Sequence, residues 1–196
     1  MFKTLLNTGF VVLNAPFLML YFLLKPISRK DTLFAGFSQC YSLVPGQVGN
    51  YLRRNFYRFT MMRCGKNVVL GFGTVFSHAD IEIGDNVYIG PQGNIGLCQI
   101  DADCLLGSGV HIMSGKKQHN FKDATQPLRE QGGTYEKITL GTNVWVGNCA
   151  LIMASVGERS VIGAGAVVVS VVESLSVMSG NPAALVSRVR HVTTPN

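Results

Sequence analysis

A six-residue repeat is the feature of this sequence that most constrains its fold. Residues 80–96, DIEIGDNVYIGPQGNIG, contain three aliphatic residues six positions apart, each followed by glycine. The same spacing returns in residues 140–147 and 156–163. The pairs are Ile83-Gly84, Ile89-Gly90, Ile95-Gly96, Leu140-Gly141, Val146-Gly147, Val156-Gly157 and Ile162-Gly163. A short fixed period of this kind predicts a solenoid rather than a globule.

The repeat indicates what each position does in such a solenoid. The aliphatic residue points inward and stacks on its counterpart in the next coil, while the glycine occupies a corner that a Cβ would crowd. Three sides of six residues give a triangular prism of short parallel strands, and hence an all-β core. An ordinary β-rich domain with scattered pairs would not explain separate six-spaced runs. The steps from Ile95 to Leu106 and from Val146 to Val156 fall short of two full sides, which predicts shortened corners.

The repeat also divides the chain into three predicted parts. Residues 1–66 form an N-terminal membrane-associating helical segment, residues 67–170 form the coil, and residues 171–196 form a tail. In the tail, GNPAALVSRVR predicts a short C-terminal helix and HVTTPN a disordered end. The coil is interrupted at residues 114–137, which carry no repeat. A long excursion within a compact coil usually serves function.

Charge is distributed unevenly along the chain. Residues 1–79 carry nine Lys and Arg against Asp31 alone, a net charge of +8, whereas residues 80–196 carry −2. Such asymmetry indicates an anionic partner surface. Because the basic segment is also hydrophobic, we expect it to contact a membrane surface, through residues 1–63, rather than nucleic acid.

Two helices are predicted in the basic segment. Residues 4–24 lack charge and are long enough to cross a bilayer core of roughly 30 Å, but Pro16 is expected to kink or break that helix. Spanning, re-entrant and interfacial arrangements therefore stay open, as does a buried helix in a trimer. If the segment spans, the basic residues that follow place the body on the cytoplasmic side.

The second predicted helix, Gly49 to Arg63, is basic and amphipathic. Helical spacing places one set of residues on an apolar face and three arginines on the other, the pattern of a helix lying among lipid headgroups. The alternative is a helix that caps the open end of the coil. The apolar set is Leu52, Phe56 and Phe59, and the arginines are Arg53, Arg54 and Arg58.

The five cysteines form no CxxC pair, and their number is odd. They predict reduced, mostly buried thiols in a cytoplasmic compartment, rather than a disulfide framework or a zinc site. A catalytic cysteine is the weaker interpretation, because buried cysteine packs as a small hydrophobe.

Several motifs resemble those of the hexapeptide-repeat acyltransferases. The six-residue repeats are followed by QHNF in the excursion, then ITLGTNVWVG, VIGAGAVV and SGNPA, over roughly residues 68–186. In this order they resemble the saccharide O-acetyltransferases and the streptogramin acetyltransferases, and the N-terminal portion resembles a subgroup linked to polysaccharide biosynthesis. The resemblance implies a left-handed parallel β-helix, a homotrimer with active sites between subunits, and acetyl-CoA as co-substrate without a metal.

His119 occupies the place of the catalytic histidine of this family. A hydroxyl is a poor nucleophile at neutral pH, so an imidazole is a suitable general base for it. The oxygen would attack the acetyl-CoA thioester, and backbone N–H groups near Gly147 or Asn148 would stabilise the oxyanion. His78 and His111 are competitors for which we expect a supporting role or none. A zinc hydratase on the same coil is a further alternative, but His111 and His119 do not match its closely spaced pair.

The resemblance also suggests residues for substrate and cofactor. For the acceptor we expect contributions from Asn94, Trp145, Asp123 and Glu130, although a trimer contact for Trp145 and solvated charge for the carboxylates are the alternatives. For coenzyme A we expect corner backbone and nearby cations. These cofactor-binding residues are Gly147, Ala164, Gly165, Arg188 and Arg190. The family's usual basic positions are Ala184 and Ser187 here, so Arg188 and Arg190 would take over phosphate binding.

Together these features predict O-acetylation of a saccharide, a surface-polysaccharide precursor or lipid-linked glycan, at the cytoplasmic face of the inner (plasma) membrane. An antibiotic or small-molecule O-acetyltransferase is the first alternative, although its acceptor would not require membrane proximity. A non-catalytic, membrane-bound assembly platform is the second.

Overall fold

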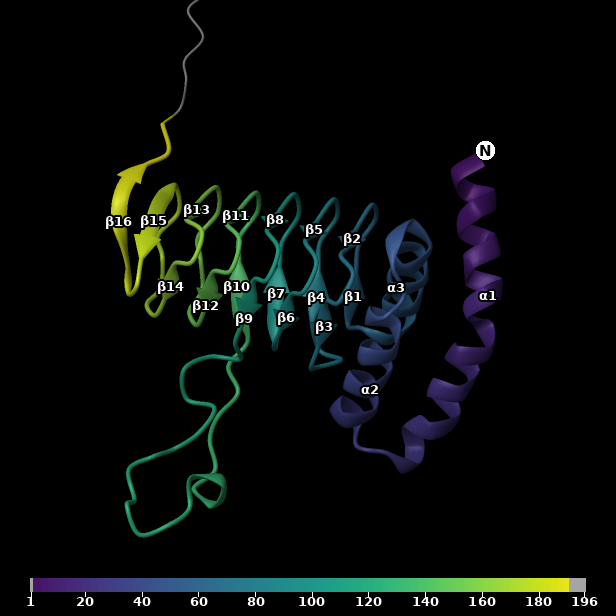
Figure 1. Cartoon of the computed structure of the whole chain (residues 1–196), viewed down its shortest axis with the longest axis horizontal. Coiled ribbons are helices and arrows are strands. Elements are labelled where there is room, and N and C mark those ends of the chain that lie inside the picture. Colours follow the sequence, from purple (N-terminus) through teal and green to yellow (C-terminus); the bar gives the residue numbers. More distant parts are fainter. Residues whose placement is uncertain (1, 191–196) are drawn as a thin grey trace, which may run out of the picture.

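The computed structural model describes residues 2–190, with side chains from Gly9 onward. The predicted disordered end, residues 191–196, lies outside them. Three α-helices are followed by a coil of short parallel strands, and Figure 1 shows the helices gathered at one end of this coil. The predicted left-handed parallel β-helix is confirmed.

The strands form three sheets, one for each side of the prism. Sheet A contains β1 (Arg63–Cys64), β4 (Glu82–Ile83), β7 (Cys98–Ile100) and β10 (Ile138–Leu140). Sheet B contains β2 (Val69–Leu70), β5 (Tyr88–Ile89), β8 (Leu105–Leu106), β11 (Trp145–Val146), β13 (Val161–Ile162), β15 (Ser176–Gly180) and β16 (Ala183–Arg188). Sheet C contains β3 (Val75–Phe76), β6 (Asn94–Ile95), β9 (His111–Ile112), β12 (Leu151–Ile152) and β14 (Val167–Val168).

The core is a set of apolar columns that run along the coil axis. In each strand pair of sheet C the second residue is aligned with its neighbours and buried. Sheet A carries an equivalent buried column of Ile83, Ile100 and Leu140. Burial of such a column requires successive coils to be in register. The sheet C column is Phe76, Ile95, Ile112, Ile152 and Val168.

Glycines at the corners allow successive coils to approach closely. A Cβ at Gly147 would lie 2.5 Å from the backbone nitrogen of Ala164 and 2.8 Å from its Cα. A Cβ at Gly90 would likewise lie 2.8 Å from the backbone of Gly107 and Ser108 in the next coil. The expectation that a Cβ would crowd these corners is confirmed, and the crowding comes from the neighbouring coil.

The corner between sheets C and A is the shortened one. Bridges join Leu140 to Val156 and Val156 to Val172, so the chain returns to the sheet A side only a few residues after β12 and after β14. The excursion, residues 114–137, leaves from this corner after β9 and returns at β10. Figure 1 shows it extending away from the coil.

The first helix, α1 (Phe2–Leu24), continues through Pro16, so of the expected kink or break the break is wrong. Pro16 is exposed, so its ring does not disturb the packed side. The buried stripe is formed by Asn14, Leu18 and Tyr21, at helical spacing. By length and composition, residues 9–27 are the one segment in the described chain that could cross a membrane, and only 11% of it is buried.

A short turn, η1 (Lys25–Ile27), leads into α2 (Lys30–Ser42) and α3 (Gly46–Thr60). These two helices cover the open end of the coil, and their side chains satisfy its edge groups. Asn50 Oδ1 accepts from Leu70 N at 2.9 Å, and Ser38 Oγ accepts from Phe76 N at 2.8 Å. The alternative of a capping helix is therefore confirmed for α3.

Arg53 corrects the predicted polar face of α3. Its side chain is 1% exposed, and it donates to the carbonyls of Leu70, Val44 and Tyr41 at 2.7–3.1 Å. The first strand of sheet B leaves a carbonyl unpaired at the coil end, and a guanidinium can satisfy several such acceptors at once. Phe59, placed on the apolar face, is 52% exposed.

The predicted C-terminal helix is wrong. The strands β15 and β16 form an antiparallel hairpin, with Ser176 opposite Arg188 and Gly180 opposite Ala183. The last coil would otherwise end in an unpaired edge of sheet B, and β16 covers that edge. Edge pairing therefore overrides the helical propensity of this segment.

The cysteine prediction holds only in part. Cys98 and Cys104 are buried and Cys64 is half-buried, but Cys40 and Cys149 are exposed. Burial raises the pKa of the Cys98 thiol to about 12 and that of Cys104 to about 11. These two thiols pack in the coil as small hydrophobes.

Candidate active site

The excursion folds back on itself as an arm whose two legs are joined by backbone hydrogen bonds, and these hold His119 in place. Thr134 N donates to the Lys117 carbonyl at 2.7 Å, and Asn120 N donates to the Gly132 carbonyl at 2.9 Å. His119 lies between these two rungs, and its side chain is exposed. The backbone of the histidine is thus fixed while its imidazole remains available to a substrate.

The root of the arm is attached to the coil. Lys137 Nζ pairs with Glu82 Oε1 on β4 at 2.5 Å, and the Tyr135 ring packs edge-on against His78 with centroids 5.4 Å apart. His78 Nδ1 is 2.8 Å from Ser77 Oγ. His78, one of the two competing histidines, therefore lies at the attachment point of the arm.

Asp123 and Glu130, the carboxylates expected to contact substrate, are occupied within the arm. Asp123 Oδ1 accepts from Thr125 N at 2.8 Å and from Thr125 Oγ1 at 2.6 Å, and these bonds lower the pKa of Asp123. Glu130 pairs with Arg129 at 3.4 Å. Among the described residues neither carboxylate bonds to His119.

Asn94 and His111 are direct neighbours on the outer surface of sheet C. The parallel register of β6 and β9 pairs them, and both side chains are exposed. Because the arm leaves immediately after β9, this pair lies close along the chain to its root. Structure and sequence together make them candidates for the acceptor side of the site.

Trp145 lies on a different side of the prism. Its exposed indole stands on sheet B between Leu105 and Val161. Together with Arg190 and Arg159 it lines a pocket of about 340 Å³. Arg159 was missed from the sequence, although it occupies a corner position with φ of 54° that recurs once per coil.

The corner residues expected to bind coenzyme A lie on the edge between sheets B and C. Ala164 and Gly165 are exposed there, and Gly165 N donates to the Asn148 carbonyl at 2.8 Å. The Gly147 N–H donates to the Ile162 carbonyl at 2.7 Å. It is therefore not available to an oxyanion, which corrects the expectation for this group.

The two tail arginines differ in what they contact. Arg188 pairs with Glu173 at 2.5 Å and donates to the Ser174 carbonyl and Ser176 Oγ, so it fastens β16 to the last coil. Arg190 instead lines the pocket beside Trp145. Of the two, Arg190 is better placed to meet a phosphate.

No cluster of three or more metal-ligating side chains occurs within residues 2–190. His78, His111 and His119 stand on three separate elements: a coil corner, β9 and the arm.

Several known acetyltransferases are similar in sequence to this chain. No protein-family model matches the chain. The galactoside O-acetyltransferase of Escherichia coli K12 is 29% identical over 129 residues, which are 64% of this chain and 53% of that protein. The chain spans only about a third to just over half the length of the first curated relatives that it matches.

Solved structures of acetyltransferases share the fold of this chain. A galactoside acetyltransferase in complex with coenzyme A superposes with a TM-score of 0.71 at 23% identity, over 82% of this chain and 81% of that one. The chain has the fold of the hexapeptide-repeat acetyltransferases. A hexapeptide-repeat acetyltransferase of Vibrio cholerae, complexed with acetyl coenzyme A, gives a TM-score of 0.70 at 17% identity, over 83% of this chain and 88% of that one.

Proposed function

We propose that this chain is an acetyl-CoA-dependent O-acetyltransferase that acts on a saccharide hydroxyl, with His119 as its general base. The observation that carries the proposal is the arm at residues 114–137, which interrupts the coil and presents an exposed imidazole on a fixed backbone. The similarity to acetyltransferases, including the saccharide-modifying galactoside enzyme, supports the reaction class.

The proposed reaction is a direct transfer. A ring nitrogen of His119 accepts the proton of the acceptor hydroxyl, and the oxygen forms a bond to the acetyl carbonyl carbon. The carbon–sulfur bond of the thioester then breaks, and the imidazolium returns its proton to the coenzyme A thiolate. The products are an O-acetyl ester and free coenzyme A, so atoms and charge balance.

The donor is proposed to lie along the coil near the exposed corner at Ala164 and Gly165. Arg190 and Arg159, beside the Trp145 indole, offer cations and an aromatic face to a phosphorylated nucleotide. Exchange of Arg190 for alanine should raise the KM for acetyl-CoA more than it lowers kcat.

A trimer would bring the separated parts of the site together. In one chain the arm leaves from the corner between sheets C and A, whereas Trp145 stands on sheet B, which lies opposite that corner. The outer surface of sheet B also exposes apolar side chains at Tyr88, Leu105 and Trp145, as expected of a surface covered by another copy. Both features support a homotrimer with active sites between subunits.

We propose that the helical end attaches the chain to a membrane surface, at the cytoplasmic face of the inner membrane. Exposed apolar residues cover the outer side of α1, including Val12, Met19 and Leu23. Because α1 packs along α3, from the stacked rings of Phe10 and Tyr51 to Tyr21, it cannot cross a bilayer without drawing α3 and its arginines into hydrocarbon. An interfacial position is therefore the arrangement proposed.

The reaction is tested with labelled acetyl-CoA in membranes that contain the native acceptor pool. Wild type should place label in polysaccharide or lipid-linked glycan, His119→Ala should not, and Lys116→Ala, an exposed change in the same arm, should behave as wild type. Label in a small molecule alone would contradict the saccharide acceptor. Unaltered transfer by His119→Ala would contradict the proposed base.

A further inference from the structure

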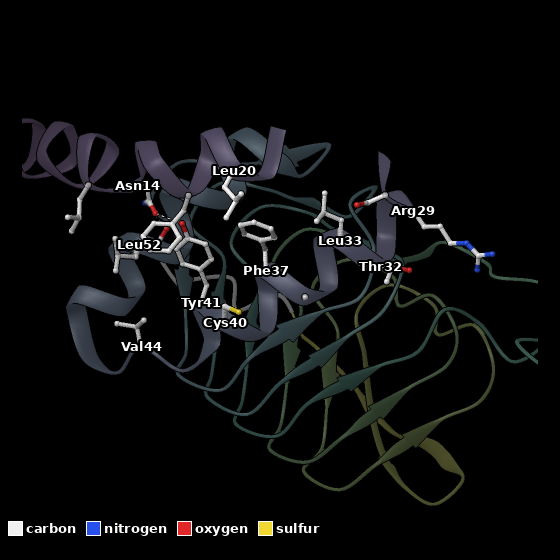
Figure 2. Close-up of a pocket in the computed structure, with 14 residues that line it drawn as sticks. Asn14, Leu20, Arg29, Thr32, Leu33, Phe37, Cys40, Tyr41, Val44 and Leu52 are labelled. Carbon is white, nitrogen blue, oxygen red and sulfur yellow. Dashed lines mark hydrogen bonds between the residues drawn. The ribbon is translucent and has the colours of Figure 1, made fainter. Parts of the chain in front are cut away.

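A deep apolar groove separates α1 from α2. Its volume is about 1010 Å³, at the upper end of what ligand-binding pockets usually reach. Figure 2 shows Leu20 and Phe37 facing each other across its middle, with Leu33 toward one end. The walls are almost entirely hydrocarbon, so the groove suits an apolar ligand.

At the end of the groove that contains Asn14 and Tyr41, the polar groups already form hydrogen bonds within the protein. Tyr41 donates its hydroxyl proton to Asn14 Oδ1 at 2.6 Å, and Asn14 Nδ2 donates to the Leu52 carbonyl at 3.1 Å. Among the described residues that line the groove, none has a buried side-chain donor or acceptor left unpaired for a polar ligand to match. An unbranched or isoprenoid hydrocarbon chain meets this condition, and a sugar does not.

The opposite end of the groove is basic. Arg29 and Ser28, which precede α2, line it together with Thr32 in the first turn of α2, and the Arg29 side chain extends outward from this end (Figure 2). No residue within the described part of the chain bonds to the Arg29 guanidinium, whereas Lys30 is paired with Asp80 at 2.5 Å. A cation at the positive end of a helix favours an anion, and a phosphate most of all.

This basic end is joined to the arm by a short series of contacts. Beside the Lys30 pair, Asp31 Oδ1 accepts from Ala79 N at 3.0 Å, which fixes the start of α2 to the coil. The residue before Ala79, His78, packs on Tyr135 of the arm. A ligand anchored in the groove would thus present its headgroup on the side of the molecule where the arm is attached.

We propose that the groove binds the hydrocarbon tail of a lipid carrier whose phosphate is held by Arg29. The proposal rests on the proposed acetyl transfer, because the carrier would be the lipid to which the acceptor saccharide is linked. Ordinary bilayer phospholipid is the competing occupant. The position of the basic end beside the root of the arm favours the carrier.

A pair of glycines provides matched variants. Gly36 lines the groove and Gly9 lies on α1 outside it; both are exposed, helical, and have no atom within 4 Å of an added Cβ. Gly36→Leu should fill the groove, whereas Gly9→Leu adds the same side chain elsewhere. Both changes raise helix propensity equally, so any difference reports on the groove.

Cys40 provides the readout. Its exposed thiol lines the groove, while the exposed Cys149 stands on the coil and serves as an internal control. The full chain is placed in nanodiscs of phosphatidylcholine, alone or with added polyprenyl phosphate or phosphatidylglycerol, and the rate of modification by N-ethylmaleimide is measured at both thiols.

Polyprenyl phosphate should slow modification of Cys40 about tenfold when present near ten times its Kd, and leave Cys149 unchanged. Gly36→Leu should abolish this dependence, Gly9→Leu should keep it, and Arg29→Gln should weaken it. Equal protection by phosphatidylglycerol would assign the groove to bilayer lipid and overturn the carrier, as would no protection at all. Acetyl transfer to a lipid-free saccharide is measured separately, so the reaction can stand where the groove proposal falls.

Discussion

Arg53 holds the Leu70 carbonyl with two hydrogen bonds, from Nε at 3.0 Å and from Nη2 at 2.9 Å. This contact joins α3 to the first strand of sheet B and closes the end of the coil. The same guanidinium also reaches the Val44 carbonyl at 2.7 Å. The helical segment is thereby part of the folded unit rather than an appendage to it.

Exchange of Arg53 for methionine should lower the free energy of unfolding by at least about 3 kcal/mol, because several buried carbonyls lose their donor. Arg58→Met, at an exposed position of the same helix, should change it by less than about 0.5 kcal/mol. Urea denaturation of both variants makes the comparison. Equal effects would contradict the capping role of Arg53.

The corner glycines predict a graded series. Gly147→Ala places its Cβ against the backbone of Ala164 at 2.5 Å, and should destabilise the coil by about 1–3 kcal/mol. Gly163→Ala meets the Ser179 side chain at 3.0 Å and the Met178 carbonyl oxygen at 3.3 Å, both farther than the contact at Gly147, and should cost less than about 1 kcal/mol. Thermal unfolding monitored by circular dichroism gives the order, and a reversal would contradict the proposed stacking.

Gly133, on the returning leg of the arm, packs closely against the backbone of Gln118 and His119. A Cβ there would collide with the Gln118 carbonyl and lie 2.9 Å from His119 N, so Gly133→Ala should displace the histidine and lower kcat by up to about a hundredfold. Gly132→Asn is the control, because φ is +70° there, space is open and asparagine tolerates that conformation. Acetyl transfer is measured alongside unfolding, and equal kcat values would contradict a fixed arm.

Stability should fall at alkaline pH because of the buried thiols. Burial raises the pKa of Cys98 from 9.0 to about 12, so the unfolded chain releases this proton first. The stabilisation that the neutral Cys98 thiol gives the folded state is fully present below pH 9 and is lost between pH 9 and about 12. The free energy of unfolding falls by roughly 1.4 kcal/mol per pH unit in this range. Urea unfolding at several pH values should show that the free energy of unfolding falls less steeply with pH in Cys98→Ala than in wild type. An unchanged dependence on pH would contradict the raised pKa of Cys98.

The coil could be predicted because its repeat fixes both faces of every strand. The inward Ile83 and Ile89 and the crowding at their glycines follow from position alone, and the excursion is evident as the place where the pattern stops. The predictions that were wrong concern the segments at the two ends of the coil. Arg53 is indistinguishable by spacing from Arg58, and only an unpaired carbonyl determines that one is buried.

The positions of the candidate site residues were predictable to the same limit. That His119 lies in the excursion follows from the sequence, but the pairing of Asn94 with His111 follows from register, and the pocket shared by Trp145, Arg159 and Arg190 requires the tail to fold as a hairpin. The tail sequence suits a helix in isolation, so only the open edge of sheet B reveals the hairpin.

The most direct test of the proposed function measures acetyl-CoA binding and acetyl transfer in the same purified preparations of wild type and His119→Ala. We expect His119→Ala to bind acetyl-CoA with an unchanged Kd and to unfold as wild type does, while kcat falls by about a hundredfold to ten thousandfold. Transfer by His119→Ala at the wild-type rate, or binding of acetyl-CoA by wild type without transfer to any saccharide, would contradict the proposed reaction.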